Sequence, residues 1–111
     1  MRTIMKRNVL HEIMTSAWRM FRVTGESFSE CLKRAWQVYK LAKAMKSQVV
    51  QFFYQKTNGE IRQAFGTMKD EVIHDKVKGT GRRKNEDLFT YWDTEKESFR
   101  SFKKFNLIKI A

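Results

Sequence analysis

The feature that most constrains the fold is an Asn58-Gly59 pair inside residues 49–68, a stretch rich in aromatic and β-branched side chains. Asparagine and glycine both accept the positive φ angles of a two-residue type I′ turn, so the stretch predicts a β-hairpin. A two-residue turn predicts a register in which Phe52 faces Phe65. Facing residues share one side of a sheet, and the apolar side predicted here consists of Phe52, Tyr54, Ile61 and Phe65.

Two amphipathic helices are predicted ahead of this hairpin. Apolar residues recur at spacings of three and four over residues 3–22, and Gly25 is the expected stop of this helix. Ser27 and Glu30 form an S-x-x-E capping box, which predicts a second helix that ends within residues 44–47. Because the connector is short, we expect an antiparallel helical hairpin.

Both predicted helices carry an aromatic pair at helical spacing. Trp18 is followed by Phe21, and Trp36 is followed by Tyr39. Large rings in small domains are usually buried, so we expect both pairs to face the core.

Short strands dominate the rest of the chain. Residues 69–77 suit a helical turn or a short crossing segment, and residues 88–92, 98–104 and 107–110 have the composition of strands. Together with the hairpin this makes about five short strands. Tight turns between such strands favour a small closed or half-closed barrel, because closure hides the edge strands.

A net charge of +11 on 111 residues is the strongest functional signal. Residues 1–47 hold 10 Lys and Arg against 3 Asp and Glu, and residues 48–111 hold 13 against 9. Such a domain attracts polyanions: nucleic acid, an anionic membrane surface or an acidic protein. The basic amphipathic segment 3–22 suits a membrane surface, but a helix whose apolar face covers a sheet is not free to enter lipid. We therefore expect no membrane partner.

Cysteine content and leader signals predict a cytoplasmic protein. Cys31 is the single cysteine, which excludes an intramolecular disulfide and suits a reducing compartment. The basic residues 1–8 are not followed by an apolar signal core, and no apolar run reaches the length of about 18 residues that a membrane span needs. We expect Cys31 to be a buried structural thiol. The neighbouring Lys33 and Arg34 keep a reactive thiol as the alternative.

The sequence carries no catalytic or metal-binding signature. His11-Glu12 lacks the second histidine of a zinc-binding H-E-x-x-H motif, and there is no Cys/His cluster. Asp93, Glu95 and Glu97 lie in a predicted turn, where turn formation and solubility explain them better than acid–base catalysis. We expect a non-enzymatic protein without a cofactor or metal.

Three runs in the second half of the chain are distinctive: FFYQKTNGEIRQAFGTM, GTGRR and YWDTEKESFRSFKKFNLI. Over about residues 49–108 they resemble a family of small bacterial and phage proteins with an Sm-like SH3-type β-barrel, named for its relation to WYL domains. The matching positions are Phe53, Lys56, Gly59, Arg62, Ala64, Gly66, Thr67, Gly79, Gly81, Arg82, Tyr91, Asp93, Arg100, Phe102, Asn106 and Leu107. The resemblance implies a setting in phages or mobile elements. It also implies a binding role, since WYL and Sm-like barrels are often linked to nucleic-acid or nucleotide recognition.

The predicted fold class is α+β. An N-terminal antiparallel helical hairpin, residues 1–47, is expected to pack on a C-terminal SH3/Sm-like β-barrel of about five strands, residues 48–111. We expect the two parts to form one compact unit.

The basic glycine loop 78–85 is the best candidate for phosphate contact. Its two glycines let backbone N–H groups turn toward an anion, and the loop lacks the Gly-Lys-Ser/Thr ending of a Walker motif. Its side-chain charge comes from Arg82, Arg83 and Lys84. A solvated loop without a ligand is the alternative.

Consecutive aromatic residues along two strands suggest base stacking. Because side chains alternate between faces, exposure of Phe53, Tyr91 or Trp92 would offer a stacking surface to single-stranded nucleic acid. The alternative is burial, by the helices on one face and inside the barrel on the other. We expect burial, following the usual preference of large rings.

Two functions fit these features. The first is binding of nucleic acid, RNA in particular, or of a nucleoprotein. The second is inhibition by docking on a host protein such as an RNA-guided CRISPR nuclease, with the basic helix faces as the docking surface. The candidate binding residues are Arg82, Arg83, Lys84, Arg62, Arg100, Lys103, Lys104, Arg19, Arg22, Lys33, Arg34 and Lys40. A monomer and a small homo-oligomer both suit the sequence.

Overall fold

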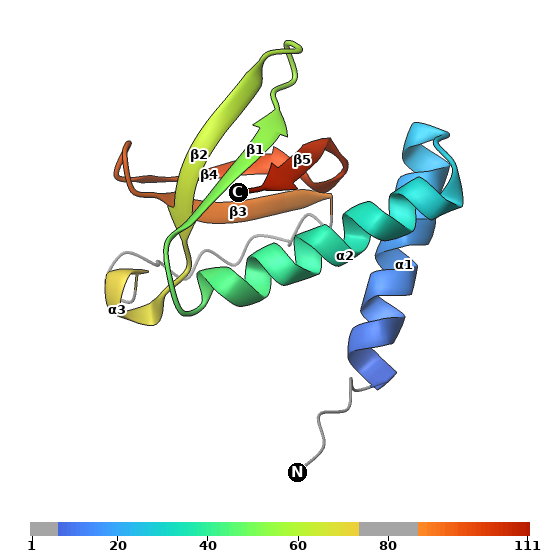
Figure 1. Cartoon of the computed structure of the whole chain (residues 1–111), viewed down its shortest axis with the longest axis horizontal. Helices are drawn as coiled ribbons and strands as arrows, with labels where there is room; N and C mark the ends of the chain where they lie inside the picture. Colours follow the sequence, from blue (N-terminus) through green and yellow to red (C-terminus); the bar gives the residue numbers. More distant parts are fainter. Residues whose placement is uncertain (1–6, 74–86) are drawn as a thin grey trace, which may run out of the picture.

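The computed structural model describes residues 7–73 and 87–111 (Figure 1). Two long helices precede a five-stranded antiparallel sheet, which confirms the α+β class. The candidate loop residues Arg82, Arg83 and Lys84 lie outside the described residues, so their predicted phosphate contacts stay a prediction.

Helix α1 spans Arg7–Thr24 and helix α2 spans Phe28–Met45. The predicted stop of the first helix is confirmed, because Gly25 adopts a φ of 74° and its N–H donates to the carbonyl of Phe21 at 3.0 Å. The predicted start of the second helix is also confirmed, since the Ser27 hydroxyl accepts from the N–H of Glu30 at 3.3 Å. Helix α2 ends at Met45, within the predicted range.

Strands β1 (Val50–Gln55) and β2 (Ile61–Thr67) form the predicted hairpin, but its predicted register is wrong by one residue. Phe52 pairs with Ala64 instead of Phe65. The predicted type I′ turn needs a positive φ at Asn58 and Gly59, and only Gly59 has one, at 93°. The N–H of Gly59 donates to the Lys56 carbonyl at 2.9 Å, so a type I turn followed by a glycine bulge makes a longer loop.

The extra loop residue reverses the side to which two predicted core residues point. Phe52 and Tyr54 are buried as expected, whereas Ile61 is 68 % exposed and Phe65 is half-buried on the other face of the sheet. A shift of one residue has this effect because side chains alternate along a strand.

The three predicted later strands match the structure to within one residue, whereas a 3₁₀ helix between the last two strands was not predicted. The predicted segment 69–77 contains a short helix, and its residues 74–77 lie outside the described residues. The short helix α3 spans Asp70–Ile73, strand β3 Leu88–Asp93, strand β4 Ser98–Lys103, the 3₁₀ helix η1 Lys104–Asn106, and strand β5 Leu107–Ile110. The strands are ordered β4-β3-β2-β1-β5, and every described pair is antiparallel.

The sheet bends where β2 meets β3. These strands pair through Gly66 and Thr67 alone, and Figure 1 shows β1 and β2 rising steeply across β3 and β4. Among the described strands, β4 and β5 are the two sheet edges and do not pair with each other, so the sheet is a half-closed barrel, which is one of the two predicted forms. Helix α2 packs along β5, η1 and β1.

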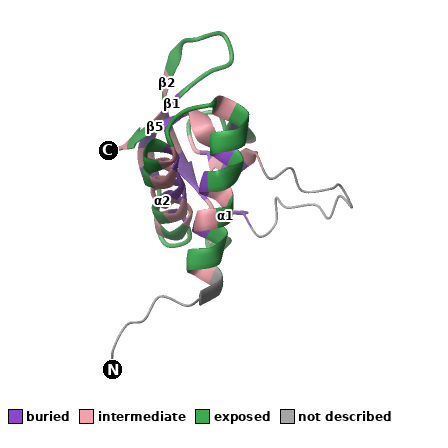
Figure 2. Ribbon diagram, turned by 90° about the vertical axis from the view of Figure 1, so that its right-hand side faces the viewer, coloured by how far each residue is buried: buried purple, intermediate pink, exposed green. Residues whose placement is uncertain are grey.

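One apolar core joins the helices and the sheet (Figure 2). Gly66 lies where the end of α2 meets the sheet, and a Cβ atom at this position would come 2.5 Å from the Tyr91 ring. Thr67 ties the same region together, since its hydroxyl donates to the carbonyls of Met45 and Gln48 at 3.1 and 3.0 Å. The buried residues of this core are Ile13, Ala17, Met20, Cys31, Ala35, Val38, Leu41, Met45, Val50, Phe52, Tyr54, Ala64, Phe89, Tyr91, Phe102 and Leu107.

The two predicted core-facing aromatic pairs have different positions in the fold. Trp36 and Tyr39 are half-buried and pack against the core, as expected. Trp18 is 45 % exposed and Phe21 is also exposed, so the prediction is wrong for this pair. Ile13, Ala17 and Met20 are the residues of α1 that lie in the core. Trp18 stays at the surface and packs against Phe28, with 4.2 Å between the two ring centres.

Candidate functional site

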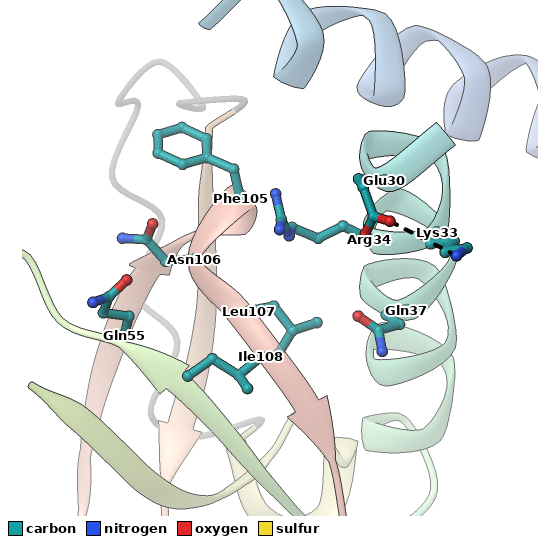
Figure 3. Close-up of a pocket in the computed structure, with 9 residues that line it drawn as sticks. All are labelled: Glu30, Lys33, Arg34, Gln37, Gln55, Phe105, Asn106, Leu107 and Ile108. Carbon is teal, nitrogen blue, oxygen red and sulfur yellow. Dashed lines mark ion pairs between the residues drawn. The ribbon is translucent and has the colours of Figure 1, made fainter. Parts of the chain in front are cut away.

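A groove lies between α2 and the segment formed by η1 and β5 (Figure 3). We call it the α2–η1 groove, and its volume is about 350 Å³. Helix α2 lines one wall, η1 and β5 line the other, and the end of β1 closes one corner. The lining residues are Glu30, Lys33, Arg34, Gln37, Gln55, Phe105, Asn106, Leu107 and Ile108.

Local geometry explains why these side chains converge. Residues 30, 33, 34 and 37 are three or four apart, so they share one side of α2. On the opposite wall, the N–H of Lys104 donates to the Asp87 carbonyl at 2.8 Å, and buried Leu107 anchors the start of β5. The β1–β5 register shifts between Phe53 and Tyr54, a bulge that leaves Ile108 unpaired and 42 % exposed in the groove.

The cations inside the groove are partly neutralised. Arg34 donates to Glu26 through both terminal nitrogens, at 2.6 and 3.3 Å. This hydrogen bonding to Glu26 raises the pKa of Arg34 and holds its guanidinium against the wall. Lys33 is 72 % exposed, and its only described ion pair is a 3.8 Å contact with exposed Glu30. Such surface pairs contribute little, so Lys33 stays available to a ligand.

Further cations surround the groove without entering it. Lys40 and Lys43 are exposed on α2, and Lys103 at the end of β4 lies with its Nζ 5.8 Å from the centre of the Phe105 ring. Lys104 opens η1, and the pKa of Asp87 is lowered by its hydrogen bond to Arg19 and, more weakly, by the charges of Lys104 and Lys103. None of these lysines is among the residues that line the groove, so their positive charge lies outside it.

A second cationic cluster occupies the inner face of the half-barrel, around the fully buried carboxylate of Asp93. Arg62 donates to it at 3.0 Å, and the Nε of Arg100 lies 3.8 Å away. The backbone N–H groups of Glu95 and Lys96 donate to its other oxygen, at 2.9 and 3.0 Å. We call these residues the Asp93 cluster.

The protonation states of the Asp93 cluster follow from these contacts. Burial by itself raises the pKa of Asp93, but hydrogen bonds from Lys96, Arg62 and Glu95 outweigh it and leave the pKa lowered. Burial by itself lowers the pKa of Arg62, but the hydrogen bond to Asp93 together with the interactions with Tyr54 and Tyr91 outweighs burial and leaves this pKa raised. Asp93 is therefore a charged structural residue of the β3–β4 turn, as its predicted turn-forming role requires.

Two tyrosine hydroxyls lie close to this cluster. The hydroxyls of Tyr54 and Tyr91 are 3.1 Å apart and buried. Burial is the main cause that raises the pKa of Tyr91, so this phenol stays protonated. The Nε of Arg62 is buried, with no hydrogen-bond partner among the described residues. These contacts link β1, β2, β3 and β4.

The structure thus separates the predicted binding residues into groups. Lys33 and Arg34 line the groove, whereas Lys40, Lys103 and Lys104 belong to its surroundings. Arg62 and Arg100 belong to the Asp93 cluster, Arg19 pairs with Asp87 at 3.0 Å, and Arg22 is exposed on α1.

Seven of the nine groove residues were absent from the predicted site: Glu30, Gln37, Gln55, Phe105, Asn106, Leu107 and Ile108. The amides are uncharged and far apart in the sequence, so no charge pattern marks them. Phe105 is half-buried at the edge of the core. The sequence signals that pointed to this segment are the lysines directly before Phe105 and the family resemblance at Asn106 and Leu107.

The three aromatic residues that the sequence suggested for base stacking are buried or half-buried. Tyr91 is fully buried, which confirms the expectation of burial for this residue. Phe53 and Trp92 are half-buried on the outer face of the sheet. The Nζ of Lys109 lies 5.1 Å from the Phe53 ring, and Trp92 packs edge-to-face on Phe99 at 5.0 Å.

Within residues 7–73 and 87–111, no cluster of three or more His, Cys, Asp or Glu side chains is arranged to hold a metal ion. Cys31 is fully buried, with its Sγ 3.9 Å from the Thr24 hydroxyl and the Glu26 carbonyl. This confirms the buried structural thiol. None of the described helices is long and apolar enough to span a membrane.

Comparisons with known proteins place the chain in a family. A family model, WYL_2, described as an Sm-like SH3 β-barrel fold, matches residues 38–108, which is more than half of the chain. The match begins inside α2, at Val38, so the second half of this helix belongs to the matched unit. The searches of curated proteins and of solved structures returned no match. The chain therefore belongs to the WYL_2 family of Sm-like SH3 β-barrel proteins.

Proposed function

We propose that this protein is a small non-enzymatic binding protein that recognises nucleic acid, RNA in particular, alone or within a nucleoprotein. The observation that carries the proposal is a row of exposed lysines on α2, beside the groove. Lys33, Lys40 and Lys43 are all exposed, and Glu30 is the only acid in the helix. At 1.5 Å per residue the row extends over about 15 Å, long enough to meet several phosphates.

The charge distribution supports this surface over the Asp93 cluster. Phosphate binding requires cations that exchange counterions for phosphates. The lysines on α2 are surrounded by solvent, whereas Arg62 is bound to a buried carboxylate. Lys103 and Lys104 add charge on the other side of the groove, although Lys104 makes a further contact of its own.

The test is a titration of a labelled 20-nucleotide single-stranded RNA, followed by fluorescence anisotropy at several salt concentrations. Three neutralised phosphates predict a slope of about −2 for log K against log salt. The triple variant Lys33→Gln/Lys40→Gln/Lys43→Gln keeps helix propensity and should weaken binding about tenfold.

A matched control separates this surface from net charge alone. Lys56→Gln/Lys69→Gln/Lys96→Gln removes the same charge from the hairpin tip, the segment before α3 and the β3–β4 turn. It should weaken binding by less than about threefold. Equal losses in the two triple variants would reduce the effect to net charge, and absence of binding by the wild-type protein would reject the proposal. The same sequence as DNA tests the preference for RNA.

A second candidate function is inhibition by docking on a host protein, of the kind that anti-CRISPR proteins perform on RNA-guided nucleases. The exposed apolar side of α1 favours it, because Leu10, Trp18 and Phe21 are exposed there and Arg22 lies beside them. Exposed Trp, Phe and Arg are typical of interface hot spots. The resemblance to proteins of phages and mobile elements points in the same direction.

The two candidates respond differently to nuclease. In a pull-down from host lysate, a protein partner stays bound after nuclease treatment, and Trp18→Ser/Phe21→Ser releases it. Nucleic-acid binding is lost with nuclease and is unaffected by this α1 variant. A partner that survives nuclease and ignores the α1 variant would remove α1 from the docking surface.

A further inference from the structure

We propose that the α2–η1 groove accommodates unpaired bases, so that the protein prefers single-stranded to double-stranded nucleic acid. This inference rests on the proposed nucleic-acid function. It deepens that function by naming the form of the ligand and the part of the ligand that each wall contacts. The groove is lined by one aromatic residue and three side-chain amides (Figure 3), and exposed lysines lie outside it.

Phe105 is the expected stacking surface. Its ring lines the groove on one side and packs against the apolar core on the other, so little freedom is lost when a base stacks on it. The nearby Lys103 ammonium, 5.8 Å from the ring centre, is placed to meet the adjoining phosphate. A ring beside a backbone-tracking cation is the usual arrangement in proteins that bind single strands.

The amides of Gln37, Gln55 and Asn106 come from three different elements and line the same groove. Gln55 donates to the Gly59 carbonyl at 3.1 Å, which fixes its orientation. A side-chain amide offers both donors and an acceptor, and matches the edges of bases. These edges are accessible in unpaired bases, whereas in A-form duplexes the major groove is too deep and narrow for side chains.

The distribution of charge favours a position of the bases inside the groove and of the phosphates outside it. Inside the groove, Glu26 neutralises Arg34, so a phosphate gains little by entering, whereas Lys33 is 72 % exposed and stays available to a phosphate at the edge. Exposed lysines lie just outside, on α2 and at the end of β4. A volume of about 350 Å³ falls at the lower end of the range for small-molecule sites, which suits one or two bases and excludes a duplex.

The test compares a single-stranded RNA with its own duplex by anisotropy, in the wild-type protein and in Phe105→Leu/Gln37→Met. This double variant keeps the charge and much of the apolar volume, and it removes one ring and one amide. We expect the wild type to favour the single strand by about tenfold or more. We expect the variant to lose about tenfold for the single strand and to leave duplex binding unchanged.

Matched controls exist on the outer face of the sheet. Phe99→Leu/Gln63→Met removes a half-buried ring and an exposed amide there, and should leave the preference intact. Thermal unfolding checks the fold of each variant, and Phe105→Tyr, which keeps the ring, should retain the single-strand affinity. Gln37→Met alone, at a surface position of α2, keeps the test valid if Phe105→Leu unfolds.

The failures of the two proposals are distinguishable. Equal affinity of the wild type for single strand and duplex, or equal losses in the groove and control variants, would overturn the groove inference while binding through the α2 lysines stands. If a protein segment occupies the groove instead, the groove variant loses the nuclease-resistant partner and keeps its RNA affinity, which also overturns the inference. Absence of any RNA binding by the wild type rejects both.

Discussion

The α2–η1 groove and the Asp93 cluster are built from similar residues, cations beside aromatic rings, yet they differ in where the acid lies. In the cluster the carboxylate of Asp93 is fully buried and accepts bonds from Arg62 and two backbone N–H groups. In the groove the nearest acid to Lys33 is exposed Glu30, at 3.8 Å. A desolvated acid holds its partners strongly, whereas an exposed one competes weakly with water.

Because of this difference, we expect the Asp93 cluster to contribute to stability and the α2–η1 groove to contribute to binding. A count of charges treats Arg62 and Lys33 as equivalent cations. They differ in burial, because the side chain of Arg62 is 19 % exposed and that of Lys33 is 72 % exposed. Variants in the Asp93 cluster should therefore change the free energy of unfolding, and variants in the groove should change affinity.

The largest effect is expected from Asp93→Ala. The change leaves Arg62 without its partner in a largely buried position, so we expect a loss of about 3–5 kcal/mol in the free energy of unfolding. Urea denaturation followed by circular dichroism measures it. Glu95→Ala, which removes an exposed carboxylate from the same turn, should change stability by less than about 0.5 kcal/mol. A loss below about 1 kcal/mol for Asp93→Ala would contradict the structural role of the cluster.

A pH titration of stability tests the same carboxylate without altering the wild-type contacts. The folded-state pKa of Asp93 is lowered, so its contribution is present above the unfolded pKa of about 3.9 and is lost as pH falls through the folded value. As the pH is lowered below about 4, we expect the urea midpoint of the wild type to decrease more steeply than that of Asp93→Asn. Parallel pH profiles of the two proteins would show that another group dominates.

A smaller effect is expected from Tyr54→Phe. It deletes one of two buried hydroxyls that lie 3.1 Å apart and leaves the Tyr91 hydroxyl without that partner. The expected loss is about 1–2 kcal/mol, measured by urea denaturation. Tyr39→Phe, at a half-buried position of α2, is the control and should be close to neutral. Equal changes in the two variants would remove the hydroxyl pair from the account.

The smallest change in stability is expected from Lys33→Gln. Its 3.8 Å contact with Glu30 is solvent-exposed, so the free energy of unfolding should change by less than about 0.5 kcal/mol. The slope of log K against log salt for RNA should nevertheless fall by about 0.7. Arg62→Gln should show the opposite pattern, with a large loss of stability and an unchanged slope for the folded fraction. A loss of stability from Lys33→Gln that matches the loss from Arg62→Gln would remove the distinction between the regions.

Local patterns predicted most of the elements correctly. The Ser27 and Glu30 capping box and the glycine stop at Gly25 each act within a few residues, so the adjacent sequence decides where the helix begins or ends. The hairpin register was wrong because Asn58 keeps a negative φ and the loop gains one residue. That local difference moved Ile61 from the predicted core to the surface.

The candidate site was only partly predictable. Lys33, Arg34, Lys103 and Lys104 were recognised by charge, whereas Gln37, Gln55 and Asn106 carry no signal until three elements are brought together. A closed and a half-closed barrel were both predicted, and the structure has the half-closed form, with α2 packed along β5, η1 and β1.

By itself, the sequence determined the two helices, the order of the strands along the chain, the basic character and the family. Each depends on neighbouring residues, on composition or on a motif read along the chain. Only the tertiary structure decided which cations are neutralised, which rings are buried and where a groove remains. Those outcomes depend on contacts between residues far apart in sequence, such as Arg62 with Asp93, and on the water that each contact excludes.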